Sequence, residues 1–277
     1  MNSKYTYMTL LGSDDYLKGT LALNHSLKIQ HSKYPLTVLV TSNVGKSTLQ
    51  RLEKEGIGYI IGNKIKVSKS IQQDNLVSGF ANWSNTFSKL LIFGMTEFKK
   101  IVFLDSDMMV VQNIDHLFEK PHLSAVAAGQ FYPGNEKWKD LNSGIMVVVP
   151  RKDEEKRLIK HLNTMNLTNG FGDQDVLQSY YSSWKKQSEL HLEEEYNVFF
   201  KYEPYFIYKF PNKKIKVIHF VGKVKPWKMS KEEEIKYKGR LIINQLKKAK
   251  SLKGVKKAMH DFRLYKNYAK NNEMRLK

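Results

Sequence analysis

The chain of 277 residues contains no cysteine. This absence excludes a disulfide scaffold, a thiolate zinc site and a cysteine nucleophile. Any metal ion must therefore be bound by Asp, Glu, His or oxygen atoms of a substrate. Hard cations, which prefer oxygen ligands, are the favoured candidates.

Long apolar runs are also missing. No stretch approaches the roughly 18 consecutive apolar residues of a membrane-spanning helix. Met1–Tyr5 leads to Asp14 and Asp15 without the apolar region of a secretory signal, so we expect a cytoplasmic protein. Hydrophobic residues still make up 41% of the chain, which indicates a globular protein rather than a disordered one.

Acidic residues are few, because 46 Lys and Arg stand against 27 Asp and Glu and give a net charge of +19. Arg240–Lys277 alone holds twelve basic and two acidic residues, and so +10 of this charge. Its Lys-rich helical spacing with partial apolar stripes predicts an interfacial helix on an anionic membrane. A nucleic-acid partner and a solvated helix packed on the core are the alternatives.

Short β-rich runs alternate with helical stretches before this tail. The expected strands are Tyr5–Leu10, Leu36–Thr41, Ile101–Leu104, Ala125–Ala128, Ile145–Val149 and Lys216–Phe220. The expected helices are Asp15–Gln30, Lys46–Glu55, Asn85–Phe98, Lys152–Met165 and Asp173–Ser183, with starts such as Asp14 and Ser84. Strands that are apolar on both faces and separated by helices predict an α/β fold, with a Rossmann-like, mostly parallel sheet flanked by helices. Ligands then belong at the carboxyl ends of the strands.

From Ser230 onward the pattern changes to a Lys-rich helix that is interrupted at Gly254. We therefore expect a domain of residues 1–229 followed by a basic helical extension of residues 230–277.

The strongest local motif is Ile101–Asp107, an apolar strand that ends in Asp105-Ser106-Asp107. In an extended segment residues i and i+2 point the same way, so the two carboxylates can converge on one divalent cation. Such a cation can bridge a diphosphate. A surface turn is the alternative, because Asp is common in turns.

A second motif, Val217–Trp227, combines a strand with His219, Gly222 and Lys225. An imidazole and two carboxylates leave positions open on an octahedral ion for phosphate oxygens, and Lys225 can donate to the same phosphate. The alternative is a structural histidine at a strand end.

Three further features have site-like chemistry. Leu141-Asn142-Ser143-Gly144 comes just before an apolar strand, and Gly170-Phe171-Gly172-Asp173-Gln174-Asp175 opens a helix. Taken alone, Asp173 is predicted to be an N-cap. Lys89, on the helix before the Asp105 strand, fits either a ligand-binding or a structural role.

Gly45-Lys46-Ser47-Thr48 follows a strand and is similar to the end of a phosphate-binding P-loop. That motif requires a glycine five residues before Gly45, where this chain has Val40. We therefore expect no nucleoside triphosphatase.

The chain from about Tyr5 to Trp227 resembles glycosyltransferase family 8, the family of glycogenin and galactinol synthase. The resemblance is carried by motifs in a fixed order: Thr9-Leu10 with Tyr16-x-x-Gly19, Phe103-Leu104-Asp105-Ser106-Asp107 with Asn113-Ile114-Asp115-x-Leu117-Phe118, Asn142-Ser143-Gly144, Gly172-Asp173-Gln174, and His219-Phe220-x-Gly222-x-x-Lys225-Pro226-Trp227. It implies a GT-A fold, a UDP-sugar donor, Mn²⁺, and transfer with retention of the anomeric configuration.

The resemblance also assigns roles. Asp105, Asp107 and His219 would bind the metal. The donor nucleotide would be held by Leu10, Gly12, Ser13, Tyr16, Lys89, Ser106, Gly222 and Lys225. The catalytic residues around the transferred sugar would be Asn142, Ser143, Asp173 and Gln174. Gly12, Ser13 and Gly170 depart from the residues that glycogenin has at these places, so glucose is not assumed to be the sugar.

We therefore expect a retaining hexosyltransferase with UDP-glucose or UDP-galactose as the donor and a saccharide, lipid-linked glycan or protein as the acceptor. A homodimer is left open. A basic nucleic-acid- or membrane-binding module with a vestigial UDP site is the alternative. No RNA-recognition motif supports nucleic acid, so we do not expect that partner.

Overall fold

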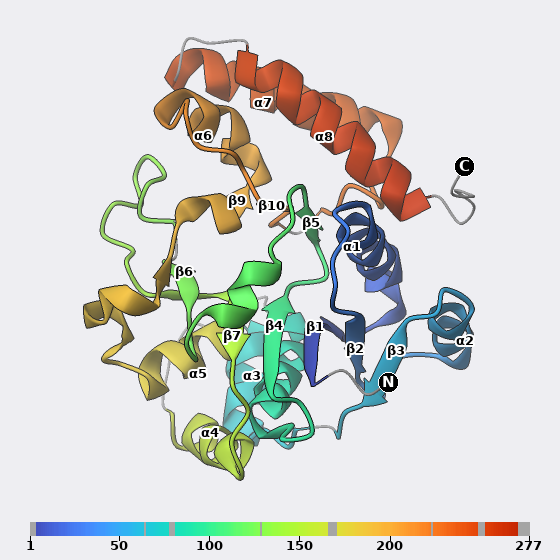
Figure 1. The fold of residues 1–277 in the computed structure, drawn as a ribbon, viewed down its shortest axis with the longest axis vertical. Helices are drawn as coiled ribbons and strands as arrows, with labels where there is room; N and C mark the ends of the chain where they lie inside the picture. The colour runs from blue at the N-terminus through green and yellow to red at the C-terminus, as the bar shows by residue number, and fades with distance from the viewer. Residues whose placement is uncertain are drawn as a thin grey trace. The chain divides into compact units, whose positions relative to one another are not determined.

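The computed structural model describes residues 4–63, 65–77, 81–127, 129–165, 171–222, 224–248 and 253–270 (Figure 1). The chain divides into two compact units. The first unit comprises Met1–Asp15, Lys33–Asp105 and Asp115–Glu194, and the second comprises Tyr16–Ser32, Ser106–Ile114 and Glu195–Lys277. Each unit is assembled from segments that are far apart in the sequence.

The first unit contains a seven-stranded sheet in the order β3-β2-β1-β4-β7-β6-β8. Strands β3, β2, β1 and β4 are parallel, β7 is antiparallel to both β4 and β6, and β8 is parallel to β6. The strands are β1 (Tyr5–Leu11), β2 (Leu36–Val40), β3 (Gly58–Ile61), β4 (Lys100–Leu104), β6 (Ala125–Ala127), β7 (Leu141–Val148) and β8 (His191–Leu192). This mixed but mostly parallel α/β sheet confirms the predicted fold class.

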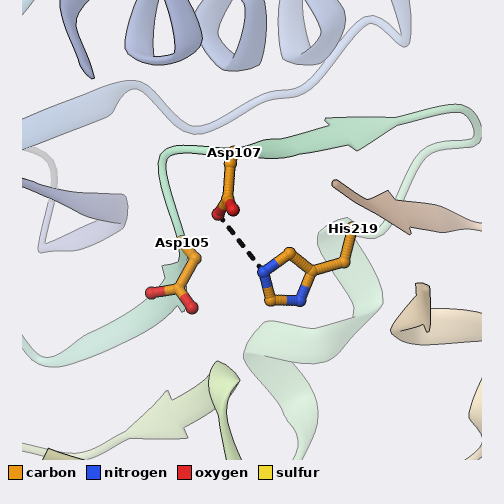
Figure 2. Close-up of side chains that lie close together, drawn as sticks. All are labelled: Asp105, Asp107 and His219. Carbon is orange, nitrogen blue, oxygen red and sulfur yellow. Dashed lines mark ion pairs between the residues drawn. The ribbon is translucent and has the colours of Figure 1, made fainter. Parts of the chain in front are cut away.

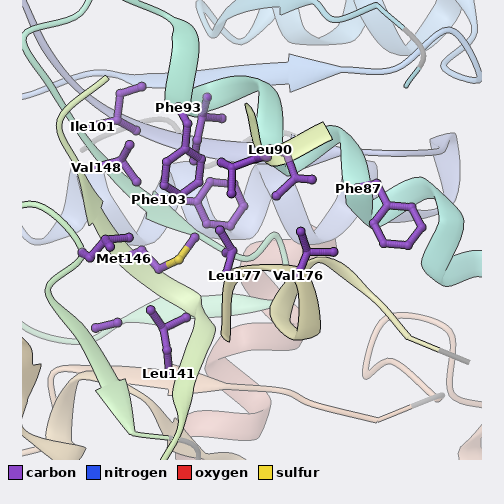
Figure 3. Close-up of a cluster of buried hydrophobic side chains, with 14 of the residues drawn as sticks. Phe87, Leu90, Phe93, Ile101, Phe103, Leu141, Met146, Val148, Val176 and Leu177 are labelled. Atoms are coloured by element: carbon purple, nitrogen blue, oxygen red, sulfur yellow. The ribbon is translucent and has the colours of Figure 1, made fainter. Parts of the chain in front are cut away.

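Helices pack on this sheet through one apolar core (Figure 3). Phe103 of β4 and Val148 of β7 lie in this core with Leu90, Phe93 and Leu177 from the helices, all fully buried. The helices of the unit are α2 (Lys46–Lys54), α3 (Lys69–Val77), α4 (Glu154–Thr164) and α5 (Asp173–Tyr180), with the 3-10 helix η2 (Ala81–Gly94). The shorter 3-10 turns of the two units together are η1 (Asp14–Tyr16), η3 (Asp115–Glu119), η4 (Trp184–Lys186), η5 (Ser188–Leu190), η6 (Glu194–Tyr196) and η7 (Phe200–Tyr202).

In its described residues the second unit contains a three-stranded sheet in the order β5-β10-β9 and four α-helices. Its elements are α1 (Leu17–Ile29), β5 (Met108–Val110), β9 (Val198–Phe199), α6 (Glu203–Lys209), β10 (Val217–His219), α7 (Lys231–Lys248) and α8 (Lys253–Lys270). Helix α8 packs against α1, α6 and α7 (Figure 1). Its buried residues recur at helical spacing, because Val255, Ala258, Phe262, Tyr265 and Ala269 all face the interior of the unit.

Several predicted boundaries were wrong. Asn142-Ser143-Gly144 was expected before a strand but lies inside β7. A strand can bury these polar residues because hydrogen bonds satisfy their polar groups. The helix expected at Asn85–Phe98 is instead the 3-10 helix η2, displaced towards the N-terminus. Gly254 does not interrupt a helix but lies in the first turn of α8, where a Cβ atom would be 2.7 Å from Cα of Pro204. Ala128, at the end of one expected strand, is outside the described residues.

Candidate functional site

Lys89 lies at the centre of a buried cluster in the first unit. Its Nζ is 3.0 Å from Asp105 Oδ1 and 2.8 Å from Asp173 Oδ2. The same ammonium donates to the backbone carbonyl and to the hydroxyl of Ser143, both at 3.2 Å. These residues come from η2, the end of β4, the start of α5 and β7. The fold thus brings together residues that the sequence analysis singled out separately.

The Lys89 cluster carries a net negative charge. Burial opposes the charged form of the lysine, but the carboxylates of Asp105 and Asp173 outweigh burial and raise the pKa of Lys89. One ammonium therefore faces two carboxylates. The side chain of Asp105 is 30% exposed, whereas that of Asp173 is 8% exposed. Asp105 is thus the carboxylate that a cation from solvent can reach.

Polar side chains of β7 and α5 are fixed next to this cluster. Gln174 Oε1 accepts a hydrogen bond from the backbone N–H of Ser143 at 3.2 Å. Asn142 Oδ1 accepts one from the N–H of Gly144 at 2.9 Å. Groups held in this way can recognise a ligand rich in hydroxyls, because they already have a defined orientation.

The start of α5 corrects the prediction that Asp173 is an N-cap. Gly172 is the N-cap residue, and its N–H donates to Asp175 Oδ2 at 2.8 Å. Because Asp175 caps the helix, the Asp173 carboxylate is available to Lys89. The preceding residue is also fixed, since Asn75 donates to Phe171 O at 3.0 Å and accepts from Phe171 N–H at 2.8 Å.

Asp107, His219 and Lys225 form a second buried cluster, which lies wholly in the second unit. Asp107 Oδ1 is 3.2 Å from His219 Nε2, and Asp107 Oδ2 is 2.5 Å from Lys225 Nζ. The antiparallel pairing of β5 and β10 places His219 opposite Met108. The N–H of Phe220 donates to the Asp107 carbonyl at 2.9 Å. Sheet pairing therefore positions the histidine beside a residue more than one hundred positions away.

The electrostatics of this cluster favour a charged Asp107. Burial opposes ionisation, but His219 and Lys225 outweigh it and hold the pKa of Asp107 well below its usual range. His219 Nδ1 is 2.9 Å from Asn197 Oδ1. With Nδ1–H donated to this oxygen, Nε2 is the ring nitrogen on the Asp107 side, so it is the nitrogen that would bind a metal ion (Figure 2).

The donor atoms of Asp105, Asp107 and His219 fit a divalent cation. These three residues form a group that could hold a metal ion, drawn in Figure 2. Only Ser106 separates the two aspartates, so the chain itself keeps their carboxylates near each other. Two carboxylates and one imidazole suit Mn²⁺ or Mg²⁺ and leave coordination positions for phosphate oxygens.

The residues predicted to bind the nucleotide in the first unit follow β1. Leu10 is in β1, and the half-buried Gly12 and Ser13 come directly after it. The Gly12 carbonyl accepts a hydrogen bond from the Thr41 hydroxyl at 3.0 Å. Because β1 and β4 are parallel neighbours, this loop and Asp105 lie at the same edge of the sheet.

In the second unit, the Tyr16 ring centroid lies 5.8 Å from Lys225 Nζ. Gly222 has φ of +122°, a conformation that favours glycine. Gly19 allows close packing, because a Cβ atom there would clash with the Ser106 carbonyl and would come within 2.7 Å of the Trp227 ring. Packing thus explains the glycine in the Tyr16-x-x-Gly19 motif.

Two positioning residues, Asn75 and Asn197, were not predicted from the sequence. Each acts through a partner far along the chain, Phe171 and His219 respectively. Neither asparagine lies in a local pattern that would identify it. Only the folded structure reveals their contacts.

The apparent P-loop end is occupied by an acidic side chain. Asp14 Oδ1 accepts a hydrogen bond from the N–H of Gly45 at 3.0 Å. Bonds from Thr48 and Gly45 lower the pKa of Asp14. A carboxylate at the start of α2 repels phosphate, which agrees with the expectation that this chain is no nucleoside triphosphatase.

The model of "Glycosyl transferase family 8" matches residues 8–231. The chain belongs to this family. This family 8 chain is 32% identical to Glycogenin-1 of Caenorhabditis elegans, over 80% of its own length and 50% of the relative's. It is also 32% identical to Glycogenin-1 of Homo sapiens, over 83% of its length and 64% of the relative's. The chain thus spans about half to two thirds of these relatives.

Solved structures show that this family 8 chain has the GT-A fold. It is similar to the bifunctional glycosyltransferase WbbM with a TM-score of 0.55 and 17% identity, over 91% of this chain and 52% of WbbM. It is similar to the active-site mutant Q189E of LgtC with a TM-score of 0.53 and 14% identity, over 86% of this chain and 96% of LgtC. Family membership favours a glycosyltransferase over the binding-module alternative. Among the described residues, no helix has the length and apolar character needed to cross a bilayer.

Proposed function

We propose that this protein is a retaining, Mn²⁺-dependent hexosyltransferase that uses a UDP-sugar donor. The observation that carries this proposal is the buried Asp107–His219–Lys225 cluster, with Asp105 two residues before Asp107 in a chain of family 8. UDP-glucose and UDP-galactose are the proposed donors. A saccharide, a lipid-linked glycan or a protein is the proposed acceptor.

Asp105, Asp107 and His219 would hold the metal ion. When bound, Mn²⁺ supplies positive charge that stabilises the departing diphosphate. Lys225 would support the same task, because its buried ammonium lies 2.5 Å from Oδ2 of Asp107, one of the proposed metal ligands. We propose that Lys225 turns to the diphosphate when the donor binds. Ser106 and Gly222 would approach the same diphosphate through their backbone.

The uridine would be held by Leu10, Gly12, Ser13 and Tyr16. These residues lie in or after β1 and ahead of α1. Gly12 and the small side chain of Ser13 would leave room for a base and a ribose. The departures at Gly12 and Ser13 would reshape this contact.

The transferred hexose would lie against Asn142, Ser143, Asp173 and Gln174, beside Lys89. The acidic, hydrogen-bonded surface of this cluster suits sugar hydroxyls. Gly170, where glycogenin has an acidic residue, is outside the described residues, so the choice of hexose rests on the experiment below.

Retention is proposed to occur by attack on the front face of the sugar, with Gln174 near the anomeric carbon. The bond between this carbon and the diphosphate oxygen breaks, and UDP leaves with the electron pair. The acceptor oxygen bonds to the anomeric carbon from the same face. Its proton passes to the departing diphosphate oxygen.

A thermal-shift panel tests the donor. The wild-type protein would be heated with UDP-glucose, UDP-galactose, UDP-N-acetylglucosamine, UDP-xylose or UDP-glucuronate, each with and without Mn²⁺. A ligand at one hundred times its dissociation constant adds about 2.7 kcal/mol of stability. We expect the largest Mn²⁺-dependent shift with UDP-glucose or UDP-galactose. Equal melting temperatures with and without all five sugars would contradict the proposal.

A cytoplasmic location with peripheral membrane contact is proposed for the C-terminal helices. Ile235 and Ile243 of α7 are 71% and 52% exposed, and Lys236 and Arg240 lie on the same helix. Exposed apolar residues flanked by basic ones fit an anionic lipid surface. Substitution Ile243→Glu should reduce co-sedimentation with phosphatidylserine vesicles, and unchanged co-sedimentation would contradict this contact.

A further inference from the structure

Tyr265 belongs to the C-terminal helix α8, which the sequence analysis assigned to an extension outside the catalytic domain. Its side chain is fully buried in the second unit. Its hydroxyl is also buried and has no hydrogen-bond partner among the residues that the structure describes. A buried hydroxyl without a partner lowers stability, so its presence calls for a physical explanation.

The ring of Tyr265 packs on the segment that carries His219 and Lys225. It stacks on Phe220, with ring centroids 4.0 Å apart and an angle of 11° between the planes. It also contacts Trp227, with the ring centroids 5.9 Å apart. Tyr265 therefore touches both ends of the Phe220–Trp227 segment.

Phe220 connects this stack to the proposed metal ligands. Its N–H donates to the Asp107 carbonyl at 2.9 Å. Its own carbonyl accepts a hydrogen bond from Lys225 Nζ at 3.2 Å. The residue that Tyr265 supports thus holds the backbone of one proposed metal ligand and the side chain of the proposed diphosphate ligand.

Tyr265 also interacts electrostatically with Asp107. Burial raises the pKa of Tyr265, and the negative charge of Asp107 raises it further. Towards an ionised carboxylate, which has no proton to donate, a tyrosine hydroxyl can act only as a donor. The Asp107 carboxylate is at present paired with His219 and Lys225.

We propose that Tyr265 is a positioning residue of the donor site, and that its hydroxyl donates to Asp107 when Lys225 turns to the diphosphate. This inference rests on the proposed function. Under it, α8 is a part of the donor-binding machinery. The unpartnered hydroxyl is then explained, because its partner becomes accessible only in the loaded enzyme. Hydrogen bonds of this kind orient a ligating carboxylate and increase metal affinity.

The test compares two single-atom deletions on the same helix. Tyr265→Phe keeps the ring that stacks on Phe220 and removes only the hydroxyl. Tyr268→Phe is the matched control, because Tyr268 is also buried in α8 but packs on His25, with ring centroids 4.6 Å apart. Mn²⁺ affinity of the full-length protein would be measured by electron paramagnetic resonance with saturating UDP. The melting temperature and the KM and kcat values for the UDP-sugar would be measured in parallel.

We expect Tyr265→Phe to weaken Mn²⁺ binding by about tenfold or more, the usual effect of losing such a supporting hydrogen bond. The melting temperature should stay the same or rise, because the deleted hydroxyl has no partner in the structure. Tyr268→Phe should bind Mn²⁺ like the wild type. In Tyr265→Phe, KM for the donor should rise more than kcat falls, because the ring at position 265 still stacks on Phe220 and the contacts to the transferred sugar are unchanged.

Two results would overturn the inference in distinguishable ways. If the wild type with UDP binds Mn²⁺ and Tyr265→Phe binds it within twofold, the positioning role is wrong and the proposed function stands. If the wild type binds no Mn²⁺ in the presence of UDP, the proposed function is wrong, and the inference that rests on it is wrong as well.

Discussion

Lys89 shows how one buried charge organises a set of polar residues. Its ammonium is within 3.0 Å of Asp105 and 2.8 Å of Asp173, and it donates to Ser143 at 3.2 Å. Removing one partner from a buried ion pair leaves an uncompensated charge, which is more costly than the pair is stabilising. The main effect of Lys89 is therefore to offset the repulsion between the carboxylates of Asp105 and Asp173, so that both can lie in the same cluster.

The substitution Lys89→Met tests this role. We expect it to lower the free energy of unfolding by about 3–5 kcal/mol, because Asp173 is buried without its cation. The double variant Lys89→Met, Asp173→Asn should regain part of this loss, since the asparagine needs no counter-charge. Urea unfolding of the three proteins measures both effects. An identical loss in the single and double variants would show that the lysine acts through packing instead.

At the level of single residues, local chemistry could be predicted but long-range contacts could not. Asp105, Asp107 and His219 were identified because carboxylates and an imidazole at strand ends are recognisable in sequence. The partnership of Lys89 with Asp173 spans 84 positions and arises only when η2 and α5 meet. The same reason hides Asn197 and Tyr265, whose neighbours in sequence give no signal.

Among the elements, α6 and α8 owe their close approach to Gly254. A Cβ atom at this position would lie 2.7 Å from Cα and 2.9 Å from the carbonyl oxygen of Pro204. Backbone atoms cannot yield as a flexible side chain can. Gly239 in α7 is a natural contrast, because nothing lies within 4 Å of a Cβ atom there.

Alanine at these two glycines should have opposite effects. Gly254→Ala should destabilise by about 1–3 kcal/mol, because the two helices must move apart. Gly239→Ala should stabilise by up to about 1 kcal/mol, because alanine favours a helix interior more than glycine does. Melting temperatures measure both. A Gly254→Ala protein that melts like the wild type would contradict the close packing.

The elements of the sheet were largely predictable because their strands are apolar on both faces. β1, β2 and β4 begin or end within one residue of their expected limits. The short strands β3, β5, β8 and β9 were missed, since two to four residues carry too little periodicity. β7 was predicted too short because Asn142 and Ser143 look like loop residues until their hydrogen bonds are seen.

At the scale of the whole molecule, the two basic C-terminal helices, α7 and α8, differ in how their apolar residues are buried. Of the basic C-terminal stretch, α8 is packed through Phe262 and Tyr265, as expected of a helix packed on the core. α7 instead presents Ile235 and Ile243 to solvent. The sequence pattern is similar in both helices, so only the fold could separate them. The boundary between residues 229 and 230 stays a prediction. If Tyr265 serves the donor site, residues on both sides of this boundary contribute to donor binding.

The release of UDP from a UDP-hexose tests the central claim most directly. UDP-glucose and UDP-galactose would be incubated with the wild type in Mn²⁺, with the wild type in EDTA, and with the Asp105→Ala, Asp107→Ala double variant in Mn²⁺. Circular dichroism would show that the variant is folded. We predict UDP release by the wild type in Mn²⁺ and a loss of at least a hundredfold in the other two samples. Equal release in all three samples would contradict the account.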